Sequence, residues 1–331
     1  MATYTFRKRK NPFRRITRWG LWLVLAGALV GGLIFTGVQG GIQWRAMLVR
    51  KGCDRPFPDL VKIQPLLMDQ QRVRFAVLGD SGMGDAGQAQ VATALGRVCA
   101  AAGCDFALLL GDNIYPSGVS SLDDPKLQTH VEQVYGPLAI PLHPVLGNHD
   151  IRKNGLVQVL HTLRSKTWRM PNYQYAFTTP QAAFFALNTN CSLFAWQQLE
   201  RDMVGVSAPW RIVFGHHPLY GSGNHGSADP ITLRLWMQDL APQVDFYLSG
   251  HNHILEHLAR EGERTQYISS GAAGWSGATA GSPHARSEVD ATSLFRHDEG
   301  GFGWFDLTAV RATFRFYDSQ GKMIYQYHRD R

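Results

Sequence analysis

One recurring pattern constrains the fold of this chain more than any other feature. Five apolar, strand-like runs each end in a glycine followed by a side chain that can bind a metal. The five pairs are Gly79-Asp80, Gly111-Asp112, Gly147-Asn148, Gly215-His216 and Gly250-His251. In open α/β sheets, ligands bind beyond the carboxyl ends of the strands, and a glycine lets the backbone turn sharply there. The pattern therefore predicts an α/β (or α+β) protein whose five turns meet at one shared crevice.

Hydrophobic periodicity places strands before these turns and helices between them. Apolar runs predict strands at 72–78, 106–110, 142–146, 183–188, 211–214 and 245–248. Helical spacing predicts helices at 86–102, 127–135, 193–203 and 231–240. Near the C-terminus, alternating apolar and polar residues predict antiparallel strands at 303–307, 312–317 and 323–328.

The N-terminal region combines a basic tail with an uncharged apolar segment. Residues 1–18 hold seven basic residues and no acidic one, and residues 20–38 carry no charge. As a helix this segment is about 28 Å long, close to the roughly 30 Å of a bilayer core. We therefore predict a basic cytoplasmic tail over 1–18, a transmembrane signal anchor over 19–38, a juxtamembrane linker over 39–70 and a folded domain over 71–331.

The alternative for the apolar segment is a cleaved signal peptide, whose apolar region usually has about 7–15 residues. The excess of basic residues before the segment places the N-terminus in the cytoplasm by the positive-inside rule. The folded domain is then extracytoplasmic, and periplasmic if the source is bacterial. Four cysteines are compatible with an oxidising compartment. Cys99 and Cys104 are close enough to bridge or to remain two buried thiols, and the pairing of Cys53 and Cys191 stays open.

The positive charge of the chain belongs to its tail. The formal net charge is +7, which the basic residues of 1–18 supply in full, so the rest of the chain is balanced. A balanced domain offers no basic face to nucleic acid. The expected partners are therefore a membrane and a small-molecule substrate.

The side chains that follow the five glycines form a set suited to two metal ions. Carboxylates and imidazoles bind iron, manganese or zinc, and no cysteine-rich cluster competes with them. A single Gly-Asp is usually only a turn, and a single Gly-His is usually a hydrogen-bonded structural histidine. Five such turns in order, each after a strand, exceed what one tetrahedral ion needs. They favour a pair of ions that share a bridging carboxylate.

These motifs resemble the calcineurin-like metallophosphoesterases and, among them, the small, tartrate-resistant type of purple acid phosphatase. The deciding residue is Tyr115, three places after Asp112, because purple acid phosphatases use a tyrosine there to bind ferric iron. The resemblance continues through Asn224-His225-Gly226 and Ser270-Gly271-Ala272 and covers about residues 72–331. It implies a four-layer metallophosphoesterase fold, in which two mixed β-sheets pack face to face, helices flank them and the metals lie at one edge.

The resemblance also implies the roles of individual residues. The ferric ion would be bound by Asp80, Asp112, Tyr115 and His253. A divalent ion (Zn²⁺, Fe²⁺ or Mn²⁺) would be bound by Asp112, Asn148, His216 and His251, with Asp112 as the bridge. His149 and His225 are expected to assist substrate binding and protonation of the leaving group. His217, where mammalian relatives carry a tyrosine, is assigned to the wall of the site.

The function that follows is a membrane-anchored acid phosphatase that hydrolyses phosphomonoesters by attack of a metal-bound hydroxide. A first alternative is a manganese- or zinc-dependent phosphodiesterase or nucleotidase of the same superfamily. A second is a non-catalytic surface binding protein. The loops at 116–126, 221–229 and 275–298 are expected to select the ester, whose identity the sequence does not give. The sequence does not give the oligomeric state either.

Overall fold

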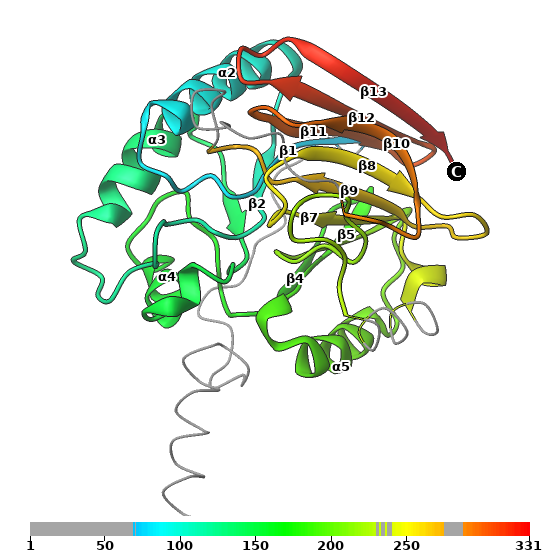
Figure 1. Cartoon of the computed structure of the whole chain (residues 1–331), viewed down its shortest axis with the longest axis horizontal. Coiled ribbons are helices and arrows are strands. Elements are labelled where there is room, and N and C mark those ends of the chain that lie inside the picture. Colours follow the sequence, from blue (N-terminus) through cyan, green and yellow to red (C-terminus); the bar gives the residue numbers. More distant parts are fainter. Residues whose placement is uncertain (1–68, 70, 230–231, 233–235, 237–239, 275–286) are drawn as a thin grey trace, which may run out of the picture. The chain divides into compact units, whose positions relative to one another are not determined.

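In the computed structural model, two β-sheets pack face to face and helices cover their outer sides (Figure 1). The structure describes residues 69 and 71–331, except 230–231, 233–235, 237–239 and 275–286. The predicted tail and membrane anchor lie outside the described residues, as does the linker apart from residue 69. Within the described part of the chain, no helix has both the length and the apolar character needed to cross a membrane.

The first sheet has six strands in the order β13-β12-β11-β1-β2-β3. The strand β1 runs parallel to β2, and β2 to β3, whereas β11, β12 and β13 add antiparallel neighbours at the other side of β1. The strands are β1 (Arg72–Leu78), β2 (Phe106–Leu109), β3 (Leu142–Pro144), β11 (Gly301–Thr308), β12 (Arg311–Asp318) and β13 (Met323–Asp330).

The second sheet has seven strands in the order β10-β8-β9-β7-β6-β5-β4. Its centre is parallel, from β5 through β6 and β7 to β9, and antiparallel strands lie at both sides. The strands are β4 (Tyr175–Thr178), β5 (Ala182–Ala186), β6 (Trp210–Phe214), β7 (Phe246–Ser249), β8 (Leu255–Ala259), β9 (Gln266–Ser270) and β10 (Thr292–His297).

The helices flank these sheets. They are α2 (Ala86–Ala102), α3 (Gln133–Tyr135), which continues a π-helical turn over Leu127–Glu132, α4 (Leu156–His161) and α5 (Ser192–Met203). Short 3₁₀ turns occupy Gly136–Leu138, Asp150–Arg152, Thr189–Cys191 and Ala241–Gln243. The helix α2 begins where the Asp85 side chain accepts a hydrogen bond from the Gln88 N–H (3.0 Å). It ends at Gly103, whose φ of 86° is a conformation that glycine adopts readily.

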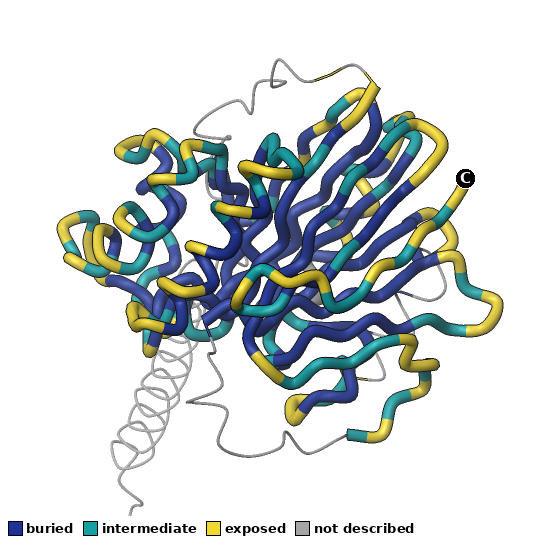
Figure 2. Tube along the Cα trace, turned by 90° about the horizontal axis from the view of Figure 1, so that it is seen from above, coloured by how far each residue is buried: buried dark blue, intermediate teal, exposed yellow. Residues whose placement is uncertain are grey.

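Successive residues of the central strands pack into two different hydrophobic clusters, one on each face of the sheet. In β5, Phe184 faces the first sheet, where it meets Phe75 edge to face at 5.2 Å, and Phe75 stacks on Phe305 at 4.9 Å. Its neighbour Phe185 belongs to a second cluster that includes Trp196 of α5. Because both faces of these strands are covered, their sequences are apolar throughout. Figure 2 shows the central strands of both sheets buried over most of their length, whereas β10 and β13 at the sheet edges are intermediate or exposed.

Most of the predicted elements are confirmed, including the helix over 86–102 and the strand over 72–78 at both ends. The helix predicted at 231–240 lies largely outside the described residues. Four strands were not predicted, namely β4, β8, β9 and β10. Of these, β8 and β9 carry polar side chains that are buried but paired: in β8, His257 lies 3.0 Å from the Tyr325 hydroxyl. The expectation of a loop over 275–298 is wrong at β10, where Phe295 stacks on Tyr325 at 4.4 Å. Cys99 and Cys104 form a disulfide.

A buried histidine in β3 makes the stability of this fold depend on pH. His143 is 1% exposed and its ring stacks on Phe177 at 4.4 Å. Burial lowers the pKa of His143 to about 3, whereas a histidine in the unfolded chain titrates near about 6.5. As the pH falls below 6.5, the unfolded state binds the proton first, so the free energy of unfolding decreases until the pH approaches 3.

We expect the substitution His143→Leu to remove this acid sensitivity. Between pH 7.5 and pH 4.5 the free energy of unfolding of the wild type should fall by about 2.5 kcal/mol more than that of the variant. The slope is about 1.4 kcal/mol per pH unit once the pH is below the pKa of the unfolded histidine. Urea unfolding at the two pH values measures the difference. An equal loss in both proteins would show that His143 is not the group responsible.

Candidate metal centre

The five predicted turns meet because β1, β2, β3, β6 and β7 end at the same edge of the paired sheets. Backbone hydrogen bonds join the turns, including Asp80 N–H to the Gly111 carbonyl (3.0 Å) and Gly250 N–H to the His216 carbonyl (3.0 Å). The glycines permit this approach: a Cβ on Gly147 would lie 2.1 Å from Asp112 Oδ1. Any larger residue there would displace the Asp112 carboxylate.

Three of the predicted ligands adopt a backbone conformation that only glycine adopts easily. The φ angles of Asp80, Asp112 and His251 are 56°, 52° and 66°. Such residues cost about 1–3 kcal/mol each and are concentrated at functional sites. Here hydrogen bonds hold them, since Asp80 Oδ2 accepts from the His251 N–H (2.7 Å) and Asp112 Oδ1 accepts from the His149 N–H (2.8 Å). The strained backbone aims all three side chains into the crevice.

The first group of predicted ligands comprises Asp80, Asp112, Tyr115 and His253. The Tyr115 hydroxyl lies 3.1 Å from Asp80 Oδ1, 2.9 Å from Asp112 Oδ2 and 3.4 Å from His253 Nε2. His253 Nε2 in turn lies 3.4 Å from Asp80 Oδ1. Both carboxylates are almost fully buried, at 0% and 1% exposure. Four ligand atoms thus surround one point.

The second group comprises Asp112, Asn148, His216 and His251. His216 Nε2 lies 2.9 Å from Asn148 Oδ1, 3.2 Å from His251 Nδ1 and 3.6 Å from Asp112 Oδ2. The other nitrogen of the same ring, His216 Nδ1, lies 2.9 Å from the Leu110 carbonyl, to which it must donate. In the neutral ring, Nε2 therefore carries a lone pair. It faces the oxygen and nitrogen atoms of Asn148, Asp112 and His251, as the ligands of a metal ion do.

The electrostatics of both groups fit bound cations. Burial, together with the charges of Asp80 and Asp112, raises the pKa of Tyr115 far above its usual value, so only a bound cation can hold its phenolate. The two carboxylates outweigh burial and raise the pKa of His216, which shows that positive charge is favoured at this point. Burial and the neighbouring His216 lower the pKa of His251 to about 2, which leaves its ring neutral.

A buried carboxylate that sequence reasoning gave no role ties two of the turns together. Asp150 accepts hydrogen bonds from the backbone N–H groups of Asn113 (3.1 Å), Ile114 (3.1 Å) and Gly147 (2.8 Å). Burial and the charge of Asp112 raise the pKa of Asp150 to about 7. The turns after β2 and β3 are therefore fixed relative to each other before any ligand binds.

The two histidines predicted to act on the substrate border the predicted ligands through different neighbours, Tyr115 for His149 and His251 for His225. His149 Nε2 is 3.9 Å from Asp112 Oδ2, and its Nδ1 is 2.7 Å from the Pro116 carbonyl. The exposed guanidinium of Arg152, which the sequence did not single out, donates to His149 Nε2 at 3.1 Å. This places a permanent positive charge beside the crevice.

His225 reaches the site from an exposed loop that a buried amide holds in place. Its ring stacks on His251 at 4.3 Å. The side chain of Asn252 accepts from the His225 N–H (3.0 Å) and donates to the Gly226 carbonyl (3.2 Å). Asn252 stands between His251 and His253, so it couples the loop to two predicted ligands. The sequence did not predict this role, because the contact joins residues far apart in the chain.

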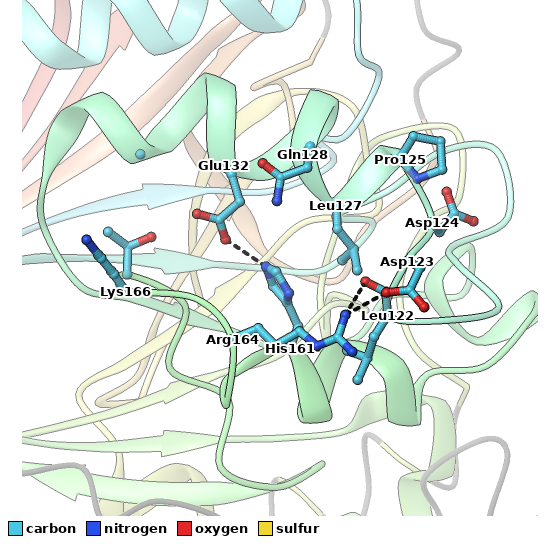
Figure 3. A pocket seen from close by; sticks show the side chains of 12 residues that line it. Leu122, Asp123, Asp124, Pro125, Leu127, Gln128, Glu132, His161, Arg164 and Lys166 are labelled. Atoms are coloured by element: carbon cyan, nitrogen blue, oxygen red, sulfur yellow. Dashed lines mark hydrogen bonds and ion pairs between the residues drawn. The ribbon is translucent and has the colours of Figure 1, made fainter.

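All nine residues predicted from the sequence lie together at this edge: Asp80, Asp112, Tyr115, Asn148, His149, His216, His225, His251 and His253. Ligation itself stays a prediction. A cavity of about 620 Å³, lined by Leu127, Glu132 and Arg164 among others, contains none of them (Figure 3). Two pairs occupy it, Arg164 with Asp123 at 2.8 Å and His161 with Glu132 at 2.7 Å. The site for chemistry is therefore the sheet edge and not this cavity.

Comparison with known proteins agrees with this geometry. Residues 73–255, more than half of the chain, match the family described as calcineurin-like phosphoesterase. This protein belongs to that family.

Its relatives include purple acid phosphatase 4 of Arabidopsis thaliana, 28% identical over 298 residues that cover 81% of this chain and 87% of the relative. Tartrate-resistant acid phosphatase type 5 of Homo sapiens is 26% identical over 294 residues, covering 77% and 90%. Among solved structures, "GAP50 the anchor in the inner membrane complex of Plasmodium" is 26% identical, with a TM-score of 0.66 and coverage of 78% and 89%. The chain is thus a phosphoester hydrolase similar to the purple acid phosphatases, whose family implies a binuclear metal centre.

The contacts of Asn252 generate a test of how His225 is positioned. We expect Asn252→Ala and His225→Ala each to lower kcat for a phosphomonoester by about 10²-fold, the lower end of what a proton-transfer group contributes. The double variant should lose no more than either single variant, because both substitutions remove the same group from the site. Metal content should stay at the wild-type value.

The variant Asn252→Asp is the matched control, since it keeps the acceptor for the His225 N–H and should lose less activity. Losses that multiply in the double variant would show that Asn252 acts independently of His225.

Proposed function

We propose that this protein is an acid phosphatase that hydrolyses phosphomonoesters at an Fe³⁺–M²⁺ centre, where M is zinc, iron or manganese. The observation that carries the proposal is the position of Tyr115, whose hydroxyl lies 3.1 Å and 2.9 Å from the Asp80 and Asp112 carboxylates. A phenolate in such a group requires a strongly charged cation. Relatives that are purple acid phosphatases support the same assignment.

Each of the predicted site residues would have a defined role in the reaction. Asp80, Tyr115 and His253 would hold the ferric ion, Asn148, His216 and His251 the divalent ion, and Asp112 would bridge the two. When bound, the ions neutralise the phosphoryl oxygens and activate a water molecule as the nucleophile. His149 and His225 flank this arrangement, where they orient the ester and supply the proton that the leaving alkoxide needs. The guanidinium of Arg152 adds positive charge beside His149.

A phosphodiesterase or nucleotidase with a manganese or zinc pair is the alternative enzyme. It uses the same carboxylates and histidines but gives Tyr115 no role, and the buried contacts of the Tyr115 hydroxyl with both carboxylates favour the first function. A non-catalytic binding protein is a third possibility, since one structural relative is titled an anchor. The complete set of predicted ligands argues against it.

We also propose that the catalytic domain is anchored to a membrane by residues 19–38 and lies outside the cytoplasm. The basic residues of 1–18 and the uncharged segment that follows support this topology. The disulfide between Cys99 and Cys104 agrees with an oxidising compartment.

Hydrolysis assays test the enzymatic proposal. At pH 5, protein loaded with iron and zinc should hydrolyse 4-nitrophenyl phosphate much faster than the corresponding diester. Asp112→Asn should lower kcat/KM at least about 10³-fold, because it weakens both metal sites and their charge stabilisation is worth several kcal/mol. The control Asp330→Asn, an exposed carboxylate paired with Arg311 outside the site, should leave the rate unchanged. Full activity in Asp112→Asn, or preference for the diester near neutral pH, would contradict the proposal.

Fractionation and mass measurement test the anchor. The protein should remain in the membrane pellet after a carbonate wash, because residues 19–38 are buried in the bilayer and not held by charge. The intact mass of the purified protein should be that of the whole chain, 36.9 kDa. A soluble product shortened by about 40 residues would identify the segment as a cleaved signal peptide.

A further inference from the structure

A third imidazole stands beside the two histidines of the second group. His217 offers a ring nitrogen within 4.8 Å of those offered by His216 and His251. The ring centroids are 4.9 Å apart for His216 and His217, 4.6 Å for His217 and His251, and 4.9 Å for His216 and His251. The three rings thus form a nearly equilateral triangle, in which each can direct one nitrogen to a common point.

The contacts of His217 orient its ring in the way that metal ligands are oriented. Its Nδ1 lies 2.7 Å from the Thr189 hydroxyl oxygen, which also accepts the His217 backbone N–H at 3.0 Å. A histidine that binds a metal usually donates its other ring N–H to an oxygen. His216 does so toward the Leu110 carbonyl. In the tautomer with the proton on Nδ1, the ring donates to Thr189 and His217 Nε2 carries the lone pair.

Hydrogen bonds hold both the ring and the backbone of His217. The His217 carbonyl accepts from the Tyr247 hydroxyl at 2.9 Å, which fixes the backbone. A cavity of about 190 Å³, to which Trp196 and Leu219 also contribute, borders His217. The contact of Nδ1 with Thr189 acts on the ring itself, which lies 4.6 Å from the His251 ring.

We propose that His217 is a further ligand of the divalent ion held by Asp112, Asn148, His216 and His251. The inference rests on the binuclear centre of the proposed function. With His217 the site offers three imidazoles beside one amide and one carboxylate oxygen. Imidazole suits zinc, whereas oxygen ligands suit manganese and magnesium. The third ring therefore shifts the preference of this site toward zinc and away from manganese.

Metal affinities of the full-length protein test the inference. We would measure the dissociation constants of Zn²⁺ and Mn²⁺ by competition with a chromogenic chelator, for the wild type and for His217→Phe. Zn²⁺ should bind at least about 100-fold more weakly to the variant, and Mn²⁺ should be affected less. Thr189→Val, which removes only the orienting hydroxyl, should weaken Zn²⁺ binding about 10- to 100-fold, as the loss of such partners usually does. The control His225→Phe replaces the imidazole that stacks on His251 with a ring that has no nitrogen, and it should change Zn²⁺ affinity less than about threefold.

A second readout keeps the test independent of activity. Co²⁺ placed in the divalent site of the wild type should change its visible d–d spectrum when His217 is replaced by Phe or Gln, because the coordination changes. Zn²⁺ affinity within about threefold of the wild type, with an unchanged Co²⁺ spectrum, would show that His217 is a wall residue. If the wild type binds both ions but hydrolyses no ester, the proposed function is wrong. The role of His217 as a ligand is then still decided by the Zn²⁺ and Mn²⁺ affinities.

Discussion

Closely spaced lone pairs at one sheet edge are the constraint on which the site depends. The Tyr115 hydroxyl lies 3.1 Å from an Asp80 carboxylate oxygen and 2.9 Å from an Asp112 carboxylate oxygen, and His216 Nε2 lies 2.9 Å from the Asn148 amide oxygen. Such acceptors repel each other unless a cation or protons lie between them. The protein therefore concentrates negative potential where two cations can bind. It does so in a buried place where few waters can screen the charge.

The fold supplies the rigidity that this arrangement needs. Parallel strands deliver their polar residues to one edge, and the aromatic core around Phe75 and Phe184 locks the two sheets together. Gly147 lets the backbone approach Asp112, and Asp150 ties the neighbouring turns through backbone N–H groups. Positive φ angles at Asp80, Asp112 and His251 show that the geometry of the site takes precedence over local backbone preference.

The sequence was sufficient to predict the side chains that follow the strands but not the residues that hold them. Asp80, Asn148 and His251 could be found because each follows a glycine at the end of an apolar run, and strand ends share one edge. Asn252, Thr189 and Arg152 act through contacts with residues distant in the chain, so no local spacing indicates them. The strand β8 was missed for a related reason, since its buried Glu256 and His257 are paired only in the folded protein.

The absorption spectrum of the iron-loaded protein is the most direct test of the central claim, that Tyr115 is a ligand of a ferric ion in the first group. We expect a visible charge-transfer band from the tyrosinate to Fe³⁺ when iron is bound under air. The band should disappear in Tyr115→Phe while iron is retained by the carboxylates and His253. A protein that binds ferric iron at this site and remains colourless would show that Tyr115 is not a ligand.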